Sequence, residues 1–247
     1  MPANITPHRK VKRKSHITEG ARQQAFEKSR NRGTCIISGF NDGTVQHLHV
    51  LPRATNTSIL TPLEWWWGFK TELSVDSRHI QIFLRGNLHI LWDRGDILIF
   101  PMADVVDIFM DKYKDGERHN ILEVICKKKI HRYCVIPHPS LSGGARSRAK
   151  RAIRQGFTNG FHKLKFVPSH AQPHFMIMNA AMKIMENKEL WVKGLEELYE
   201  EIHLKIDASR IVEVILRLHA LWTAPPPGEA QLIRKQEHMS VKIFDPW

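Results

Sequence analysis

Residues 34–101 constrain the fold of this 247-residue chain more than any other stretch. They begin with two short β-favouring runs at 35–38 and 45–51, separated by a segment rich in Gly, Asn and Asp. We therefore expect a β-hairpin. Because successive side chains of a strand alternate between its two faces, His47 and His49 should share one polar face of the second strand.

A short helix is expected later in the same stretch. Leu84, Leu88 and Leu91 recur at spacings of four and three, which is the helical period, and His89 lies on a different stripe of that helix. Gly95 should follow its end. The stretch therefore predicts a strand with a histidine pair and a helix that carries a third histidine.

The same stretch contains the segments C-I-I-S-G, H-V-L-P-R-A-T, L-E-W-W-W-G, D-S-R and F-L-R-G-N-L-H-I-L-W-D-R-G. These segments resemble the HNH nuclease family, closest to fungal HNH nuclease domain-containing proteins. The resemblance implies a ββα finger that holds one divalent ion, with His49 as the general base and His89 as a metal ligand. It also implies metal-dependent endonuclease cleavage of DNA, with RNA open as a substrate.

The chemistry of phosphodiester hydrolysis agrees with this division of roles. A neutral histidine, with an ordinary pKa near ~6.5, can deprotonate a water molecule. Mg²⁺ or Mn²⁺ accepts a site of few protein ligands completed by phosphate oxygens and water, and Zn²⁺ is an alternative. His47 is a second candidate ligand, and Asn87, His79 and Asp93 are candidates for supporting roles.

Two positions depart from the family pattern. The residue before the base is often an acidic metal ligand in HNH proteins, and here it is Leu48. The asparagine that gives the family its middle letter should fall near residue 80, where this chain has His79 and Ile80. Two interpretations therefore stay open. One is an active endonuclease, and the other is a catalytically degenerate HNH-fold module that binds nucleic acid or another partner without cutting.

The net charge of +12 is concentrated in two segments. Residues 1–33 hold nine Lys or Arg against two Glu, and residues 141–170 hold seven with no acid, so the rest of the chain carries −2. Such concentration favours a polyanionic partner that meets particular surfaces. The basic run at 8–14 also fits a nuclear-import signal. We expect DNA contacts from Lys10, Lys12, Arg13, Lys14, Arg53, Arg85, Arg148, Lys150 and Arg151.

Cysteine usage and hydropathy limit the class of protein. Cys35, Cys126 and Cys134 are too few and too scattered for a secreted disulfide framework. Without a C-x-x-C spacing, we expect small buried thiols rather than a zinc site. No apolar run approaches the ~18 residues of a membrane span. We therefore expect an intracellular protein, nuclear or cytoplasmic, with no membrane partner, and the sequence leaves its oligomeric state open.

Changes in composition divide the chain into five segments. We expect a basic arm and helix at 1–33, an HNH-like nuclease domain at 34–140, a basic linker at 141–170, a helical region at 171–223 and a tail at 224–247.

The elements expected after the finger are of two kinds. A small antiparallel meander should use strands at 97–100, 105–110, 121–126 and 133–136. Three amphipathic helices should follow, with Asp207 as the N-cap of the last. The predicted fold class is therefore α+β: an HNH-like ββα finger with a small antiparallel sheet and a C-terminal helical region.

Overall fold

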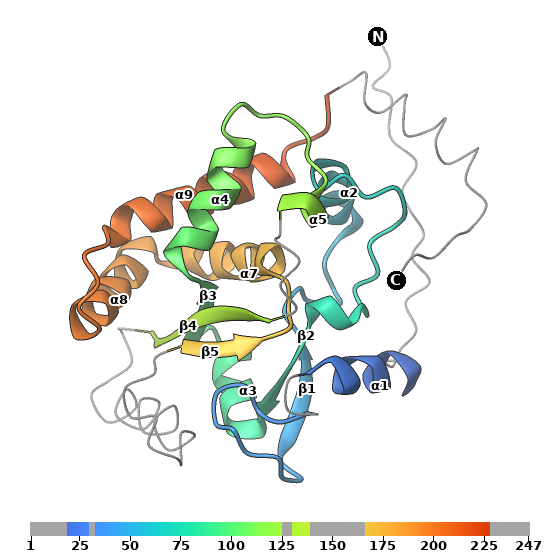
Figure 1. Ribbon diagram of the computed structural model, residues 1–247, viewed down its shortest axis with the longest axis vertical. Helices are drawn as coiled ribbons and strands as arrows, with labels where there is room; N and C mark the ends of the chain where they lie inside the picture. Colours follow the sequence, from blue (N-terminus) through green and yellow to red (C-terminus); the bar gives the residue numbers. More distant parts are fainter. Residues whose placement is uncertain (1–18, 30–32, 125–129, 139–165, 228–247) are drawn as a thin grey trace.

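The computed structural model describes residues 19–29, 33–124, 130–138 and 166–227 (Figure 1). Its helices and strands in chain order are α1 (Glu19–Lys28), β1 (Val45–His49), α2 (Thr57–Trp66), η1 (Arg78–Ile80), β2 (Gln81–Arg85), α3 (Gly86–Asp93), β3 (Ile97–Pro101), α4 (Ala103–Tyr113), α5 (Ile121–Val124), β4 (His131–Pro137), β5 (Phe166–Ser169), α7 (Pro173–Glu186), α8 (Lys188–Glu201) and α9 (Ala208–Thr223). This mixture of helices and small antiparallel sheets confirms the α+β class.

The ββα finger is present, but the expected hairpin was wrong. β1 pairs antiparallel with β2, and His49 lies opposite Gln81. Residues 35–38 form a turn, in which the Gly39 amide donates to the Cys35 carbonyl at 2.8 Å. This turn lies beside β2 rather than beside β1, because the Ile36 amide donates to a β2 carbonyl at 2.9 Å.

The helix of the finger begins later than its leucine spacing predicted. Leu84 belongs to β2 and is fully buried, so the helix starts only at Gly86. Its end agrees with the prediction. Gly95 follows α3 with φ +73°, a left-handed conformation that glycine adopts without steric cost.

The predicted meander was only partly right. β3 and β4 lie where strands were expected, and they pair antiparallel. The predicted strand at 105–110 is instead part of α4, since Ala103, Val106, Phe109 and Tyr113 form a buried stripe at helical spacing. The predicted strand at 121–126 begins as the short helix α5, and Cys126 lies outside the described residues.

The third strand of this sheet, β5, pairs with β4. It falls inside the range 141–170 that was predicted to be a linker, so that range needs correcting at its C-terminal end. Val167 of β5 points into the core and is fully buried. A solvated linker would leave this side chain exposed to water.

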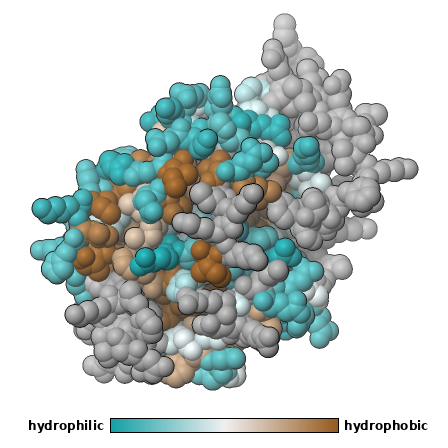
Figure 2. All heavy atoms as spheres, viewed as in Figure 1, coloured by the Kyte–Doolittle hydropathy of each residue, from teal (hydrophilic) through white to brown (hydrophobic). Residues whose placement is uncertain are grey.

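The three C-terminal helices form a layer against the second sheet (Figure 1). α7 packs on β3, and α9 packs on α7, α8, α4 and α2. Asp207 caps α9 as predicted, accepting a hydrogen bond from the Arg210 amide at 3.0 Å. On the face shown in Figure 2, apolar side chains gather mainly over these C-terminal helices, among hydrophilic ones. None of the described helices is long and apolar enough to cross a membrane.

One hydrophobic core joins the finger to the helical layer. Trp67, which follows α2 and is fully buried, stands edge-on to Phe175 of α7 and Trp222 of α9, with ring centroids 5.3 and 5.5 Å away. Cys35 and Cys134 are buried free thiols in the same core. The finger and the C-terminal helices therefore pack on one shared core.

Two histidines are buried where α7 begins. His170 is 4% exposed, and burial lowers its pKa to about 4, reinforced by His79 and opposed by a hydrogen bond to the Arg78 backbone. His174 is 1% exposed, and its burial lowers the pKa well below the ordinary value. Both rings are therefore neutral in the folded protein at pH 7.

We predict that acid destabilises the fold between pH ~6.5 and ~4. In that window His170 binds a proton in the unfolded chain but stays neutral in the folded protein. The free energy of unfolding should therefore fall by about 1.4 kcal/mol for each pH unit of acidification. Urea unfolding at pH 7, 6 and 5 measures the slope. The variant His170→Asn should have a shallower slope than the parent, and equal slopes would contradict the prediction.

Candidate functional site

β1 presents candidate functional side chains on both of its faces. His47 and His49 share one face, with ring centroids 5.6 Å apart, and His47 lies 5.1 Å from Phe83 across the strand pair. Gln46 points the opposite way and contacts His89 of α3. α1 and α3 accordingly lie on opposite sides of the β1–β2 pair (Figure 1). The strand therefore separates two polar clusters.

The first cluster, the His49 site, joins His49 to Asp76 and Arg53. His49 Nε2 lies 3.1 Å from Asp76 Oδ1. Because a carboxylate oxygen only accepts, Nε2 carries the proton and Nδ1 carries the lone pair. Arg53 donates to both oxygens of Asp76, from Nε to Oδ1 at 3.0 Å and from Nη2 to Oδ2 at 3.3 Å. The chain thus holds a histidine with its basic nitrogen turned away from an aspartate.

His47 belongs to the same site through Gln81. Its Nε2 donates to Gln81 Oε1 at 2.5 Å, and Gln81 Nε2 donates to the Asp76 carbonyl at 2.5 Å. Gln81 is fully buried, and its side-chain oxygen and nitrogen each have one of these partners. His47 is therefore linked to Asp76 of the His49 site through the side chain of Gln81.

Burial sets the protonation of both strand histidines. It lowers the pKa of His47 to about 4, although the hydrogen bond to Gln81 opposes the shift. Burial also lowers the pKa of His49, and the charge and hydrogen bond of Asp76 oppose it. Both rings are therefore neutral near pH 7. A neutral imidazole is the form that can accept a proton, which suits the predicted role of His49 as a general base.

The second cluster, the His89 site, consists of His89, Asp93 and Gln46. His89 Nδ1 lies 2.6 Å from Gln46 Oε1, and since an amide oxygen only accepts, Nδ1 is the donor. His89 Nε2 lies 3.3 Å from Asp93 Oδ2, one helical turn along α3. A neutral ring has no second proton, so its lone pair then faces an anionic oxygen. A proton or a metal ion between the two atoms relieves that repulsion.

The donor set of the His89 site fits a divalent cation. Metal–ligand distances of about 2.1 Å place two atoms that share one ion no more than about 4.2 Å apart, and the observed 3.3 Å lies within that limit. Gln46 would orient the imidazole from its other nitrogen, as partners of metal-bound histidines usually do. The described residues contain no group of three or more His, Cys, Asp or Glu side chains placed to bind a metal. Mg²⁺ and Mn²⁺ accept as few as two protein ligands when water and phosphate oxygens complete the coordination.

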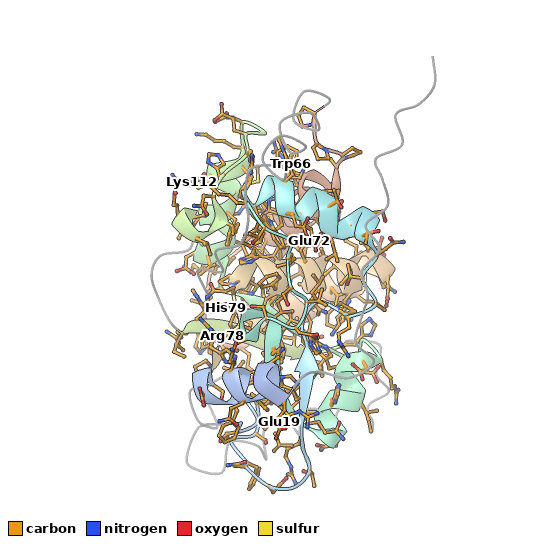
Figure 3. The ribbon with its side chains drawn as sticks, turned by 90° about the vertical axis from the view of Figure 1, so that its right-hand side faces the viewer. Glu19, Trp66, Glu72, Arg78, His79 and Lys112 are labelled. Atoms are coloured by element: carbon orange, nitrogen blue, oxygen red, sulfur yellow. The ribbon has the colours of Figure 1, made fainter. Side chains whose placement is uncertain are left out.

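The structure brings only some of the predicted site residues together. Asp93 lies against His89, whereas His47 lies on the other face of β1. Asn87 is exposed on α3, two residues before His89. His79 lies in η1, where its carbonyl accepts from the Gln172 amide at 2.9 Å, and Figure 3 shows it with Arg78 just above α1. The predicted supporting residues are thus distributed over three places.

The predicted DNA-contacting residues Arg53 and Arg85 both have carboxylate partners. Arg53 binds Asp76, and Arg85 Nη2 lies 3.2 Å from Asp42 Oδ2 while its guanidinium sits 4.8 Å from the centre of the Phe40 ring. The other predicted contacts lie outside the described residues, namely Lys10, Lys12, Arg13, Lys14, Arg148, Lys150 and Arg151.

Three residues of these sites were not identified from the sequence. Gln46 alternates with His47 along β1, so the strand pattern alone could have placed it on the other face. Asp76 and Gln81 gave weaker signals. Asp76 lies in an irregular segment before η1, and only the folded chain shows that it reaches His49.

Comparison with known proteins agrees with the finger. Residues 35–99 match the family model described as HNH endonuclease. The match covers about a quarter of the chain and includes β1, β2 and α3. It supports the HNH family for this segment and indicates a nuclease-type function with nucleic acid as the substrate. No curated protein and no solved structure matches the chain.

The two departures from the family pattern are both core residues. Leu48 is 3% exposed on the α3 side of β1. Ile80 is fully buried, and its backbone is fixed because the carbonyl accepts from the Val50 amide at 2.7 Å and the amide donates to Ser77 at 3.0 Å. Neither side chain can bind a metal, and each contributes to packing.

We predict that Ile80→Asn destabilises the fold by at least about 3 kcal/mol, because it removes a buried aliphatic side chain and leaves an amide in an apolar environment. Thermal and urea unfolding measure the loss. Ile90→Asn, at a 59% exposed position of α3, is the matched control and should change stability little. Equal stabilities for the two variants would show that position 80 accepts the family's asparagine.

Proposed function

We propose that this protein is a metal-dependent endonuclease that hydrolyses phosphodiester bonds of DNA. The observation that supports the proposal is the pair of clusters beside β1. A neutral histidine, His49, pairs with Asp76 at the end of β1, and His89 pairs with Asp93 on α3. These are the two chemical functions that phosphodiester hydrolysis requires: a base for the attacking water and ligands for a cation.

His49 acts as the base through Nδ1. It takes a proton from a water molecule, whose oxygen forms the new bond to phosphorus while the bond to the leaving oxygen breaks. The leaving oxygen receives a proton from solvent. The imidazolium formed in this step is stabilised by Asp76, which lies 3.1 Å from Nε2. RNA is an alternative substrate, since no described residue is assigned to the sugar.

His89 and Asp93 are the residues proposed to hold the metal. We propose Mg²⁺ or Mn²⁺, with Zn²⁺ as the less favoured alternative. When bound, the metal supplies Lewis-acid stabilisation of charge on the phosphate and the leaving oxygen. Gln46 holds His89 in the tautomer that leaves Nε2 available. Asp93 has a side chain that is 66% exposed, so the pair is open to a substrate phosphate.

We propose that one substrate meets both sites at β1. Among the described residues, β1 pairs only with β2, so its other edge carries no strand. His49 is the last residue of β1, and Gln46 with His89 lies on the opposite face near the same strand. We propose that the scissile backbone crosses this open edge, with the phosphate between the two clusters.

A second candidate function is a catalytically degenerate module that binds nucleic acid without cutting it. The specific observation in its favour is that Leu48 and Ile80, which occupy two positions of the family's site pattern, are both buried apolar residues. The two histidine sites also leave the strand on opposite faces. In this case the protein would bind DNA but would leave its backbone intact.

We predict metal-dependent nicking of supercoiled plasmid by the parent protein, abolished by EDTA. His49→Ala should lower the cleavage rate by about 10²–10⁴-fold while leaving Mn²⁺ affinity unchanged, because a general base is not a ligand. His89→Ala should weaken Mn²⁺ binding in titration calorimetry. His203→Asn, in the exposed turn after α8, is the control and should behave as the parent does. Binding without cleavage in the parent would favour the degenerate module.

The N-terminal basic segment should contribute affinity rather than chemistry. Deleting residues 1–16 removes five Lys or Arg, and each lost phosphate contact should make the slope of log affinity against log salt shallower by ~0.9 for duplex DNA. Fluorescence anisotropy at several salt concentrations measures this slope. Cleavage at saturating DNA should persist. An unchanged slope would indicate another role for the segment, such as nuclear import.

A further inference from the structure

Hydrogen bonds hold both the backbone carbonyl and the side-chain carboxylate of Asp76. Its carbonyl accepts from the side chain of Gln81, which is fully buried, and its carboxylate receives two hydrogen bonds from Arg53. Its segment is closed by a turn in which the Ser77 amide donates to the Ser74 carbonyl at 3.0 Å. A loop aspartate with this many partners has little freedom to move.

The carboxylate of Asp76 faces the nearly buried side chain of His49. The His49 side chain is only 8% exposed, and its Nε2 points at Asp76 Oδ1. An imidazole in such surroundings has two neutral tautomers, and the aspartate selects the one with the proton on Nε2. It also compensates the positive charge that appears when the ring takes up a second proton.

We propose that Asp76, fixed by Arg53 and Gln81, is the positioning residue of His49: it sets the Nε2–H tautomer and turns Nδ1 toward the attacking water. The catalytic consequence rests on the proposed function, whereas the tautomer is a property of the resting protein and can be tested without cleavage. Arg53 supports this positioning role, because its guanidinium holds the carboxylate in place, while its predicted DNA contact stays a prediction.

The groups that surround His49 have opposing electrostatic effects. Burial lowers its pKa most, Asp76 raises it by charge and by hydrogen bond, and Arg53 lowers it. Replacing the carboxylate with a neutral amide therefore lowers the pKa further. An asparagine can also present its NH₂ group to Nε2, which favours the other tautomer. Asp76→Asn should thus give a weaker and wrongly oriented base in an almost unchanged shape.

The direct experiment is ¹⁵N NMR of the histidine side chains in the full chain, comparing the parent with Asp76→Asn. The parent should show the His49 proton on Nε2. The variant should shift the tautomer toward Nδ1–H and titrate at lower pH. Asp107→Asn is a matched control, since Asp107 of α4 also pairs with two guanidinium nitrogens of an arginine. Nη1 and Nη2 of Arg210 in α9 donate to its carboxylate at 2.7 and 2.9 Å. An unchanged His49 spectrum in Asp76→Asn, with the fold intact by melting temperature, overturns the proposal.

The kinetic experiment uses plasmid cleavage with Mn²⁺. Asp76→Asn should lower kcat at least about tenfold with little change in KM, since removal of the aspartate that orients a catalytic histidine costs ~10⁴ in serine proteases. Asp76→Glu should recover part of the loss, and Asp107→Asn should retain full activity. Equal kcat for the parent and Asp76→Asn overturns the proposal. Absence of cleavage in the parent overturns the proposed endonuclease instead, and the NMR comparison then decides the positioning role alone.

Discussion

The antiparallel pairing of β1 with β2 determines where the candidate side chains of β1 lie. Since side chains alternate along a strand, the register that sets His49 opposite Gln81 also sends His47 toward Phe83 and Gln46 toward α3. A slip of one residue would exchange the faces and move Leu48 out of the core. The hydrogen bond from Val50 to Ile80 at 2.7 Å continues this register beyond the strand.

The C-terminal helices hold the strand pair in position from behind. Asn179 of α7 donates to the Val50 carbonyl at 2.8 Å, just after His49. Lys183, one turn further along α7, donates to the Ile97 carbonyl at 3.1 Å and lies 3.5 Å from the centre of the Trp92 ring in α3. The same helix thus contacts the end of β1 and the helix that carries His89. These contacts limit the movement of the two histidine sites relative to each other.

Local patterns predicted the parts of the site that local structure creates. The strand with His47 and His49 and the stop at Gly95 follow from period and glycine chemistry. The helix with His89 follows from the leucine spacing except at Leu84, which belongs to β2. The partner strand was missed because β2 is buried on both faces at Gln81–Leu84, so it lacks the alternation of a half-exposed strand. Asp76 was missed because a loop aspartate becomes a histidine partner only through tertiary packing. The strand predicted at 105–110 is part of α4, and the prediction was wrong because a short apolar run fits both periods.

We propose that a divalent cation binds at His89 and Asp93 while His49 serves as the base from the other side of β1. An anomalous difference map from crystals grown with Mn²⁺ and a short DNA duplex tests it most directly. We expect a peak bonded to His89 Nε2 and an Asp93 oxygen, with a backbone phosphate between the metal and His49 Nδ1. A peak at His47 and His49 instead, or a His89 site with no metal beside bound DNA, would contradict it.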